Sequence, residues 1–305
     1  MAGSGQIGAL SRMLIDTTST FDGGSFWAEF LSETITQQIP VLNSAGIRGT
    51  RAQASERNRR GNETVSGTIE FEASRALLDV LLPAALGEDE EANVFEVAES
   101  LPSLCFLIDK GFDICLVSNA KIGTLTITGE QSQLVRVSVN IEAESITWGQ
   151  DWPESSPAPD VTKPYFFSDA SDVTLASSAR KIFSFEVTVD NALVTDQFAN
   201  QLTRAGLINA SDRIVTCNLT LPGTTGNSAL QNQAVTGAAV SIVLTNAAEA
   251  SSVLTIALGR VAFEAGALTV GTKGQLVLPL NGVARALGHA GETAPDIKIT
   301  NAHAT

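Results

Sequence analysis

Strict alternation of apolar and polar residues is the feature that most constrains the fold of this chain. Six segments show it: Val65–Phe71, Lys121–Thr128, Leu134–Glu142, Ile182–Val189, Ile214–Leu221 and Leu276–Leu280. A period of two places every second side chain on the same face of a strand, so each segment is typical of a half-buried β-strand. Val, Ile, Thr and Phe are frequent in them, as a pleated surface favours. The alternation predicts a mainly β fold.

Few segments have helical periodicity. Residues 74–86 carry leucines on one helical face, with Ser74 suited to the N-cap and Gly87 to the end. Pro83 is expected to kink this helix or to end it early. Residues 194–205 are the second helical candidate. We therefore expect short helices that pack against sheets.

A proline-rich segment lies near the midpoint of the 305 residues. A chain of this length is typical of two domains. Proline holds the residue before it extended, so residues 153–164 are expected to be a linker or a long crossing loop. The predicted domains are residues 1–152 and 165–305.

The two halves have similar patterns. Residues 63–74 resemble residues 211–223, and residues 112–145 resemble residues 251–285. This repeat indicates an internal duplication of one domain. The alternative is two β-domains that share only the alternation common to strands.

The charge of the chain is unevenly distributed. The net charge is −14, which argues against a general nucleic-acid binder. Against this background, one short stretch is basic and carries Arg48, Arg51, Arg57, Arg59 and Arg60. Its Gly/Asn/Ser-rich setting predicts an exposed loop. The loop can be merely solvated, can bind phosphate groups, or can contact the acidic body of a neighbouring copy.

Residues for catalysis or for holding a cofactor are scarce. The chain has two histidines, His289 and His303, so a histidine-rich metal site is nearly excluded. The glycines of residues 3–8 match a dinucleotide-binding pattern, but no strand precedes them. The acidic run of residues 88–91 lacks the spacing of a calcium loop. We expect no catalytic site, no cofactor and no metal, and therefore no enzyme.

The cysteines and the hydropathy indicate whether the chain is expected in a membrane or in secreted form. Cys105, Cys115 and Cys217 lie in apolar patterns without a CxxC motif, so they are expected to be buried thiols. Apolar runs are too short to span a membrane, and the first residues lack the pattern of a secretion signal. We expect no membrane anchor.

One combination of segments resembles a known family. The strand–helix unit VSGTIEFEASRALLDVLLPAALG follows the Arg/Gly/Asn-rich loop GTRAQASERNRRGNE in a duplicated, acidic, mostly β chain. This combination resembles the tail tube protein of long-tailed (siphophage-type) bacteriophages, of the two-domain (duplicated) type. The resemblance is strongest over residues 47–86 and covers the rest only as strand order.

The resemblance implies a fold and an assembly. Each domain would be a β-sandwich with a short flanking helix, and sheets of neighbouring subunits would join edge to edge into a ring. A duplicated chain would form trimeric, pseudo-hexameric rings that stack into a tube. Residues 43–62 would reach the next ring through their arginines. The implied partners are other copies and the tip, terminator and tape measure proteins of a virion tail made in the host cytoplasm.

The tube would be a channel through which DNA passes without specific binding. A carboxylate-lined wall repels phosphate groups and so favours passage over binding. Polar positions of the alternating strands are the candidates for this wall: Glu70, Glu72, Glu142 and Glu144. The alternative function is a non-enzymatic virion decoration, tail-tip or adhesin-like β-sandwich binding module.

Overall fold

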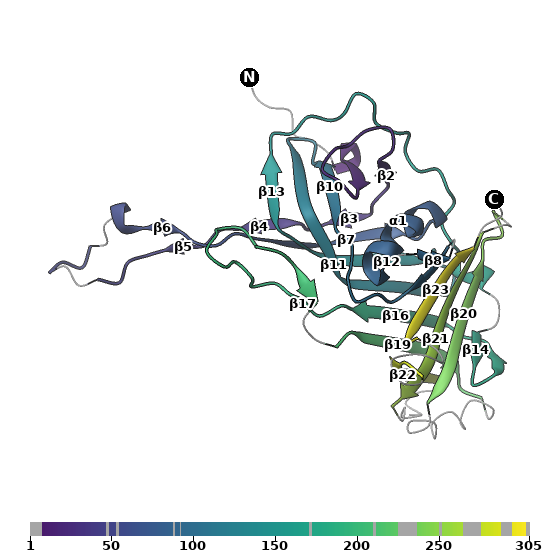
Figure 1. The fold of residues 1–305 in the computed structure, drawn as a ribbon. Coiled ribbons are helices and arrows are strands. Elements are labelled where there is room, and N and C mark those ends of the chain that lie inside the picture. Colours follow the sequence, from purple (N-terminus) through teal and green to yellow (C-terminus); the bar gives the residue numbers. More distant parts are fainter. Residues whose placement is uncertain are drawn as a thin grey trace.

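The computed structural model describes residues 8–46, 49–52, 55–87, 89–91, 93–170, 173–209, 212–224, 237–249, 252–264, 276–287 and 295–302. Antiparallel strands make up most of this part of the chain, and it contains one α-helix (Figure 1). The expectation of a mainly β fold is confirmed.

The strands divide between the two halves of the chain. The first half contains β1 (Arg12–Asp16), β2 (Phe26–Ala28), β3 (Ser32–Glu33), β4 (Thr36–Gln38), β5 (Val41–Leu42), β6 (Arg59–Arg60), β7 (Thr64–Glu72), α1 (Arg75–Leu86), β8 (Asp89–Glu91), β9 (Val94–Glu96), β10 (Leu104–Asp109), β11 (Ile114–Glu130), β12 (Arg136–Ala143) and β13 (Ser145–Trp148). The second half contains β14 (Val173–Leu175), β15 (Ser178–Arg180), β16 (Ser184–Asp190), β17 (Leu193–Val194), β18 (Ile208–Asn209), β19 (Ile214–Pro222), β20 (Ala238–Thr245), β21 (Val253–Phe263), β22 (Val277–Arg285) and β23 (Ile297–Ala302). Short 3-10 turns occur at Gly8–Leu10, Ser55–Arg57 and Phe167–Asp169.

Each of the six alternating segments lies largely within one strand, namely β7, β11, β12, β16, β19 and β22, although three of them begin one or two residues before the strand does. In β7 the apolar Val65, Ile69 and Phe71 are buried, while Glu70 between them is exposed. The alternation therefore separates a core face from a polar face, as a period of two requires.

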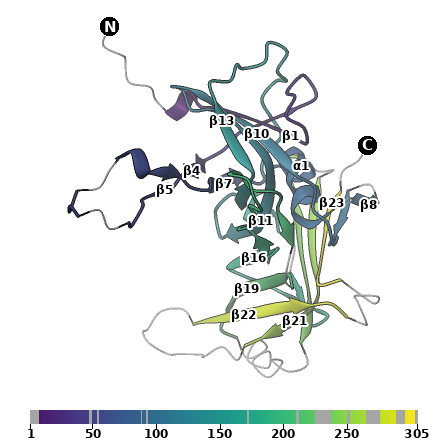
Figure 2. The ribbon, with the colours of Figure 1, turned by 60° about the vertical axis from the view of Figure 1, so that its left-hand side comes forward.

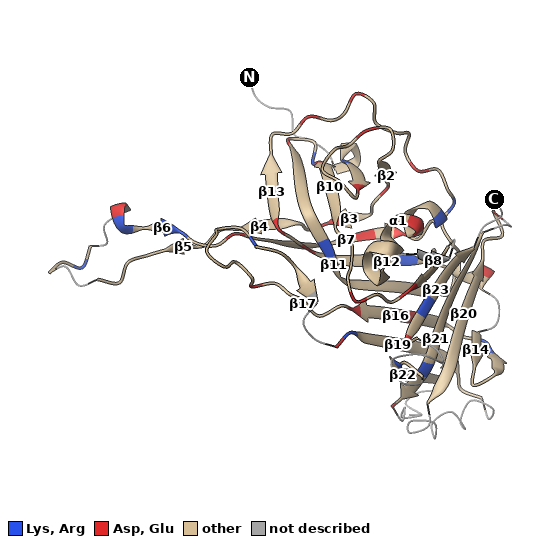
Figure 3. Cartoon of the chain, in the orientation of Figure 1, with Lys and Arg blue, Asp and Glu red and all other residues tan. Residues whose placement is uncertain are grey.

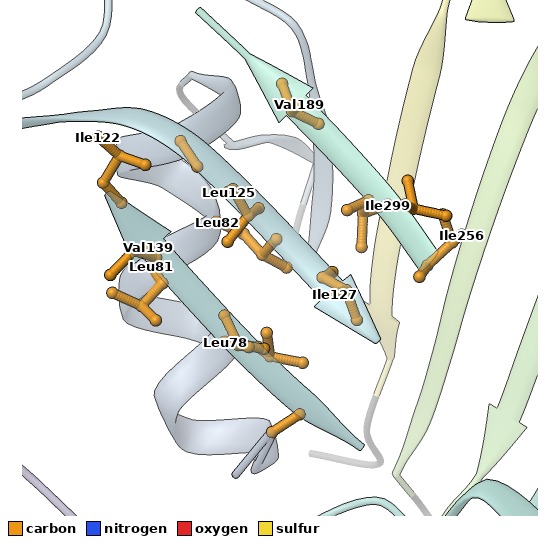
Figure 4. Packing of buried hydrophobic residues seen from close by; sticks show 14 of the residues in the cluster. Leu78, Leu81, Leu82, Ile122, Leu125, Ile127, Val139, Val189, Ile256 and Ile299 are labelled. Atoms are coloured by element: carbon orange, nitrogen blue, oxygen red, sulfur yellow. The ribbon is translucent and has the colours of Figure 1, made fainter. Parts of the chain in front are cut away.

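The helix α1 forms where the leucine pattern predicts it. Ser74 is its N-cap, and the Ser74 hydroxyl accepts a hydrogen bond from the Leu77 amide at 3.2 Å. Pro83 lies inside the helix, which continues to Leu86, so an early end at the proline is wrong. The reason is packing, because the buried leucines of α1 contact apolar side chains of β11 and β12 (Figure 4).

The second expected helix, residues 194–205, is absent from the structure. The segment is an irregular excursion between β17 and β18, which pair through Leu193 with Asn209 and Val194 with Ile208. Tertiary contacts of Arg204, described below, outweigh a weak helical propensity.

Strand pairing follows the same order in the two halves. The first half pairs β2–β1–β10–β11–β13, and the second pairs β15–β14–β20–β21–β23. The other edge of each long strand continues as β11–β12–β7–β4 and as β21–β22–β19–β16. In both halves, then, the long central strand connects two sheets.

The register of these strands also matches. Val65 of β7 faces Ala143 of β12 on one side and Gln37 of β4 on the other. Val215 of β19 faces Ala284 of β22 and Val189 of β16 in the same way. This agreement favours a duplication, although the domain bounds and the duplication itself stay predictions.

The proline-rich segment packs across the first half. Its Asp160 amide donates to the Trp27 carbonyl at 3.1 Å, and Trp152 contacts Trp27 edge-to-face with 5.3 Å between ring centroids. One continuous apolar core spans both halves. Within it the Tyr165 hydroxyl donates to Asn301 Oδ1 at 2.9 Å, which connects the two ends of the second half.

Candidate assembly surfaces

The sheets of the two halves join inside the chain through β11 and β16. These strands pair from Thr124 with Asp190 to Glu130 with Ser184. The hydroxyls of Thr126 and Thr188 lie 3.0 Å apart across the joint. The sheet of the first half therefore continues without interruption into that of the second, through β4, β7, β12, β11, β16, β19, β22 and β21.

The strands β3 and β4 are the counterpart of β16 at the outer end of this sheet. Ser32 faces Glu70 as Ser184 faces Thr220, and Thr36 faces Ser66 as Thr188 faces Thr216. In the described part of the chain β3 and β4 pair only with β7, so their other side is a sheet edge. Such an edge is a ready template for pairing with another chain.

Gly67 of β7 allows β3 and β4 to lie close. A Cβ added at this position would lie 2.5 Å from the Ile35 Cα atom and 2.6 Å from its backbone nitrogen. Backbone atoms cannot move aside as a flexible side chain can. The shape of the edge therefore depends on glycine at this position.

The polar face of the continuous sheet carries the wall candidates and several residues besides. Its side chains are Ser66, Thr68, Glu70 and Glu72 in β7; Arg136, Ser138, Asn140 and Glu142 in β12; Lys121, Thr124, Thr126, Thr128 and Glu130 in β11; Ser184, Glu186, Thr188 and Asp190 in β16; and Thr216, Asn218 and Thr220 in β19. Hydroxyl and amide side chains predominate, and the acids are mixed with Lys121 and Arg136. The face is thus polar from β7 to β19 and acidic only in places, whereas β22 adds the exposed Val277, Pro279, Asn281, Val283 and Arg285 to it.

The four predicted wall residues differ in their surroundings. Glu70 is exposed and Glu72 partly so, whereas Glu142 forms an ion pair with Arg204 at 2.8 Å. Glu144 lies at the bend between β12 and β13 and accepts a hydrogen bond from the Asn119 amide nitrogen at 2.8 Å. Glu186 and Asp190 were not predicted, although the alternation of β16 that predicted the strand also marks both as polar positions.

Residues 39–63, which we call the arm, connect β4 to β7, and their described parts project away from the rest of the chain (Figure 1 and Figure 2). At its base β5 pairs with β6, Val41 with Arg60 and Leu42 with Arg59. The structure places Arg51, Arg57, Arg59 and Arg60 in exposed positions along the arm (Figure 3); Arg48 lies outside the described residues.

The arm also carries exposed apolar side chains. Ile39 is 39% exposed, Val41 62% and Leu42 57%. Arg60 forms an ion pair with Glu63, whose side chain is only 5% exposed. Because Arg60 is paired with this buried carboxylate at the foot of the arm, the described arginines without such a pair are Arg51, Arg57 and Arg59, further along it.

Residues 191–209, which we call the hairpin, occupy the place in the second half that the arm occupies in the first. The hairpin connects β16 to β19 as the arm connects β4 to β7. It folds back on the first half, where the Arg204 guanidinium donates to the carbonyls of Val65 and Ala143, each at 2.9 Å. Sequence patterns offered no signal for this buried arginine.

The described residues offer few groups suited to catalysis or to metal binding. All three cysteines are buried, as predicted, and burial raises the pKa of Cys115 to about 11 and that of Cys217 to about 12. Such thiols are poor nucleophiles near neutral pH. In the same described ranges, no three His, Cys, Asp or Glu side chains come together to hold a metal ion. The helix there is too short to cross a membrane.

Comparison with known protein families identifies a match. A family model described as phage tail tube protein matches residues 8–284, which is most of the chain. No curated protein matches.

Proposed function

The chain belongs to the phage tail tube protein family and is thus a structural subunit of a virion tail; from this premise we propose that three copies close into a pseudo-hexameric ring and that such rings stack into the tube. Each chain would contribute two equivalent domains, residues 1–152 and 165–305, connected by residues 153–164. Three chains then supply six domains.

The joint between β11 and β16 carries this proposal. It shows that the sheet of one half accepts the edge strand of the other, through seven paired positions. The edge formed by β3 and β4 is the counterpart of β16, and β21 is the counterpart of β11. If the same joint forms between copies, each chain gives one edge and receives another. Repetition of that joint closes a ring and removes the exposed edge.

The polar face of the continuous sheet would then line the channel. Rows of Thr, Ser and Asn give phosphate groups no cation to bind, and Glu70, Glu72 and Glu186 repel them. Lys121 and Arg136 reduce this repulsion but lie beside carboxylates, since Lys121 faces Glu142 and Arg136 faces Glu72. We propose that DNA passes such a wall without specific binding.

The arm would connect one ring to the next. A ring that contacts the next one through a different surface from its own assembles without limit into a filament. The exposed arginines of the arm suit an acidic neighbour, because the rest of the chain is strongly acidic. Tip, terminator and tape measure proteins are the further partners proposed, and no catalytic role is proposed.

Negative-stain microscopy of the purified full chain at high concentration tests this function. We expect rings and tubes of constant bore, and we expect the assembled tubes not to retain double-stranded DNA at moderate salt. A chain that stays monomeric at every concentration contradicts the proposal.

A further inference from the structure

The hairpin fills a defined site on the first half. Besides its bonds to Val65 and Ala143, Arg204 forms an ion pair with Glu142 at 2.8 Å. The Glu63 amide donates to the Leu202 carbonyl at 2.7 Å. The site is the end of the sheet where β7 begins and β12 ends.

The second half contains the same end of the same sheet. The pair Val65–Ala143 corresponds to Val215–Ala284, because each is flanked by the equivalent strand, β4 or β16. By the same register Glu142, which faces Ser66, corresponds to Val283, which faces Thr216. Each half therefore has a surface at which a hairpin from another domain can bind.

The second site exposes two apolar side chains, with the charged Asp190 and Arg285 beside them. Ile214 is 50% exposed and Val283 36% exposed. Their counterparts on the first half are the polar Thr64 and Glu142. The first site suits the guanidinium of Arg204, whereas the second suits an aliphatic side chain, since covering exposed apolar area is favourable.

The base of the arm has the matching chemistry. Counted from the equivalent strands β4 and β16, β5 stands where β17 stands, and both pair within their own loop. Leu193 and Val194 of β17 are half-buried, and a Cβ added at Gly123 of β11 would lie 3.7 Å from Leu193 Cδ1. Val41 and Leu42 of β5 are 62% and 57% exposed. The hairpin lies against the other half of its own chain, whereas Val41 and Leu42 at the base of the arm stay largely exposed.

We propose that the base of the arm of one copy, through Val41 and Leu42, covers Ile214 and Val283 on the second half of the adjacent copy in the same ring. The occupant is a second copy of this chain, and the surface it covers is the counterpart, on the second half, of the one that the hairpin covers on the first half. The inference rests on the proposed ring, and it adds a specific contact that orients each copy toward the next.

Cysteine cross-linking in assembled full-length protein tests the contact. The variant Val41→Cys with Val283→Cys is treated with a short bismaleimide after assembly; the native thiols are buried and have raised pKa values. We expect covalent species that end at the copy number of one ring. Each single-cysteine variant, and the pair Val41→Cys with Val161→Cys, should lose these species, because Val161 is exposed in the midpoint segment.

The outcomes separate the contact from the proposed function. Normal tubes without cross-linked species contradict the contact and leave the function standing. Species that extend beyond one ring place the contact between rings and also contradict it. Unmodified protein that forms no rings overturns both.

A second variant covers the case in which the cysteine pair does not assemble. Val41→Asp with Leu42→Asp should keep the thermal midpoint of the single chain, since both side chains are exposed, yet lose ring formation. Val161→Asp is the matched control and should keep both. Rings formed by the double aspartate variant contradict the contact.

Discussion

The Arg204 guanidinium lies 2.8 Å from the Glu142 carboxylate, although the two residues belong to opposite halves of the chain. Both side chains are largely buried, at 4% and 18% exposed. Arg204 also donates through Nε to the Thr195 carbonyl at 2.8 Å, within its own hairpin. The arginine thus holds the hairpin in shape and binds it to the neighbouring domain.

Replacing Arg204 by alanine should strongly destabilise the chain. The change leaves the Glu142 carboxylate and two carbonyls without their buried partner, and breaking a buried pair costs about 3–5 kcal/mol. Arg204→Lys keeps the charge but loses the planar fork, so it should recover only part of the loss. Urea unfolding followed by circular dichroism measures the free energy.

The control for this substitution is a surface ion pair. Lys298 is 42% exposed and pairs with Glu96, so Lys298→Ala should cost no more than about 1 kcal/mol. Equal losses for Lys298→Ala and Arg204→Ala would refute the special role of the buried arginine.

Gly67→Ala tests the sheet edge. The added methyl meets the backbone of Ile35 at 2.5 Å, and overpacking of this kind costs about 1–3 kcal/mol. The edge formed by β3 and β4 must shift, so ring formation should weaken while the rest of the fold persists. Gly8→Ala is the control, because a Cβ there meets nothing within 4 Å. Unchanged assembly of the Gly67 variant would show that this edge takes no part in the ring.

Stability should fall in alkaline solution. Burial raises the pKa of Cys217 from 9.0 to about 12 and that of Cys115 to about 11. Because the folded state holds the thiols neutral, their contribution is fully present below pH 9 and is lost as the pH rises toward the folded pKa. Thermal midpoints from pH 7 to 11 should therefore decline above pH 9, and less steeply for Cys217→Ala. Parallel curves for the two proteins would contradict this assignment.

Charge reversal on the arm should impair stacking but not folding. The best set is Arg51→Glu, Arg57→Glu and Arg59→Glu, since Arg60 is already paired with the buried Glu63. Exposed charges contribute little to the stability of one chain, so its thermal midpoint should hold. Tube length in negative stain should drop sharply, and salt should shorten unmodified tubes because it screens the same contacts. Full-length tubes from the triple variant would rule out a role for the arm arginines.

Strands were the most predictable part of this fold. Alternation over residues such as Val65, Ile69 and Phe71 reports burial on one face directly, and each segment named from it is a strand. The helix at residues 75–86 was also predictable, because leucine spacing and Ser74 as a cap agree with each other. In these elements local preference and tertiary packing favour the same structure.

Other features depend on contacts that no local pattern contains. Residues 194–205 have acceptable helical spacing, but Arg204 is held by partners 61 and 139 positions away in the chain. The sequence identified the proposed wall residues only in part. Alternation places Glu142 on the polar face, but it does not indicate the ion pair of Glu142 with Arg204. Contacts between residues far apart in the sequence determine these features.

Cryo-electron microscopy of assembled tubes gives the number of chains in one ring and the strand pairing between them. We predict three chains in each ring, with β3 and β4 of one chain extending the sheet of the next as β16 extends that of the first half. A ring of six chains, or neighbouring chains whose sheets do not pair, would contradict it.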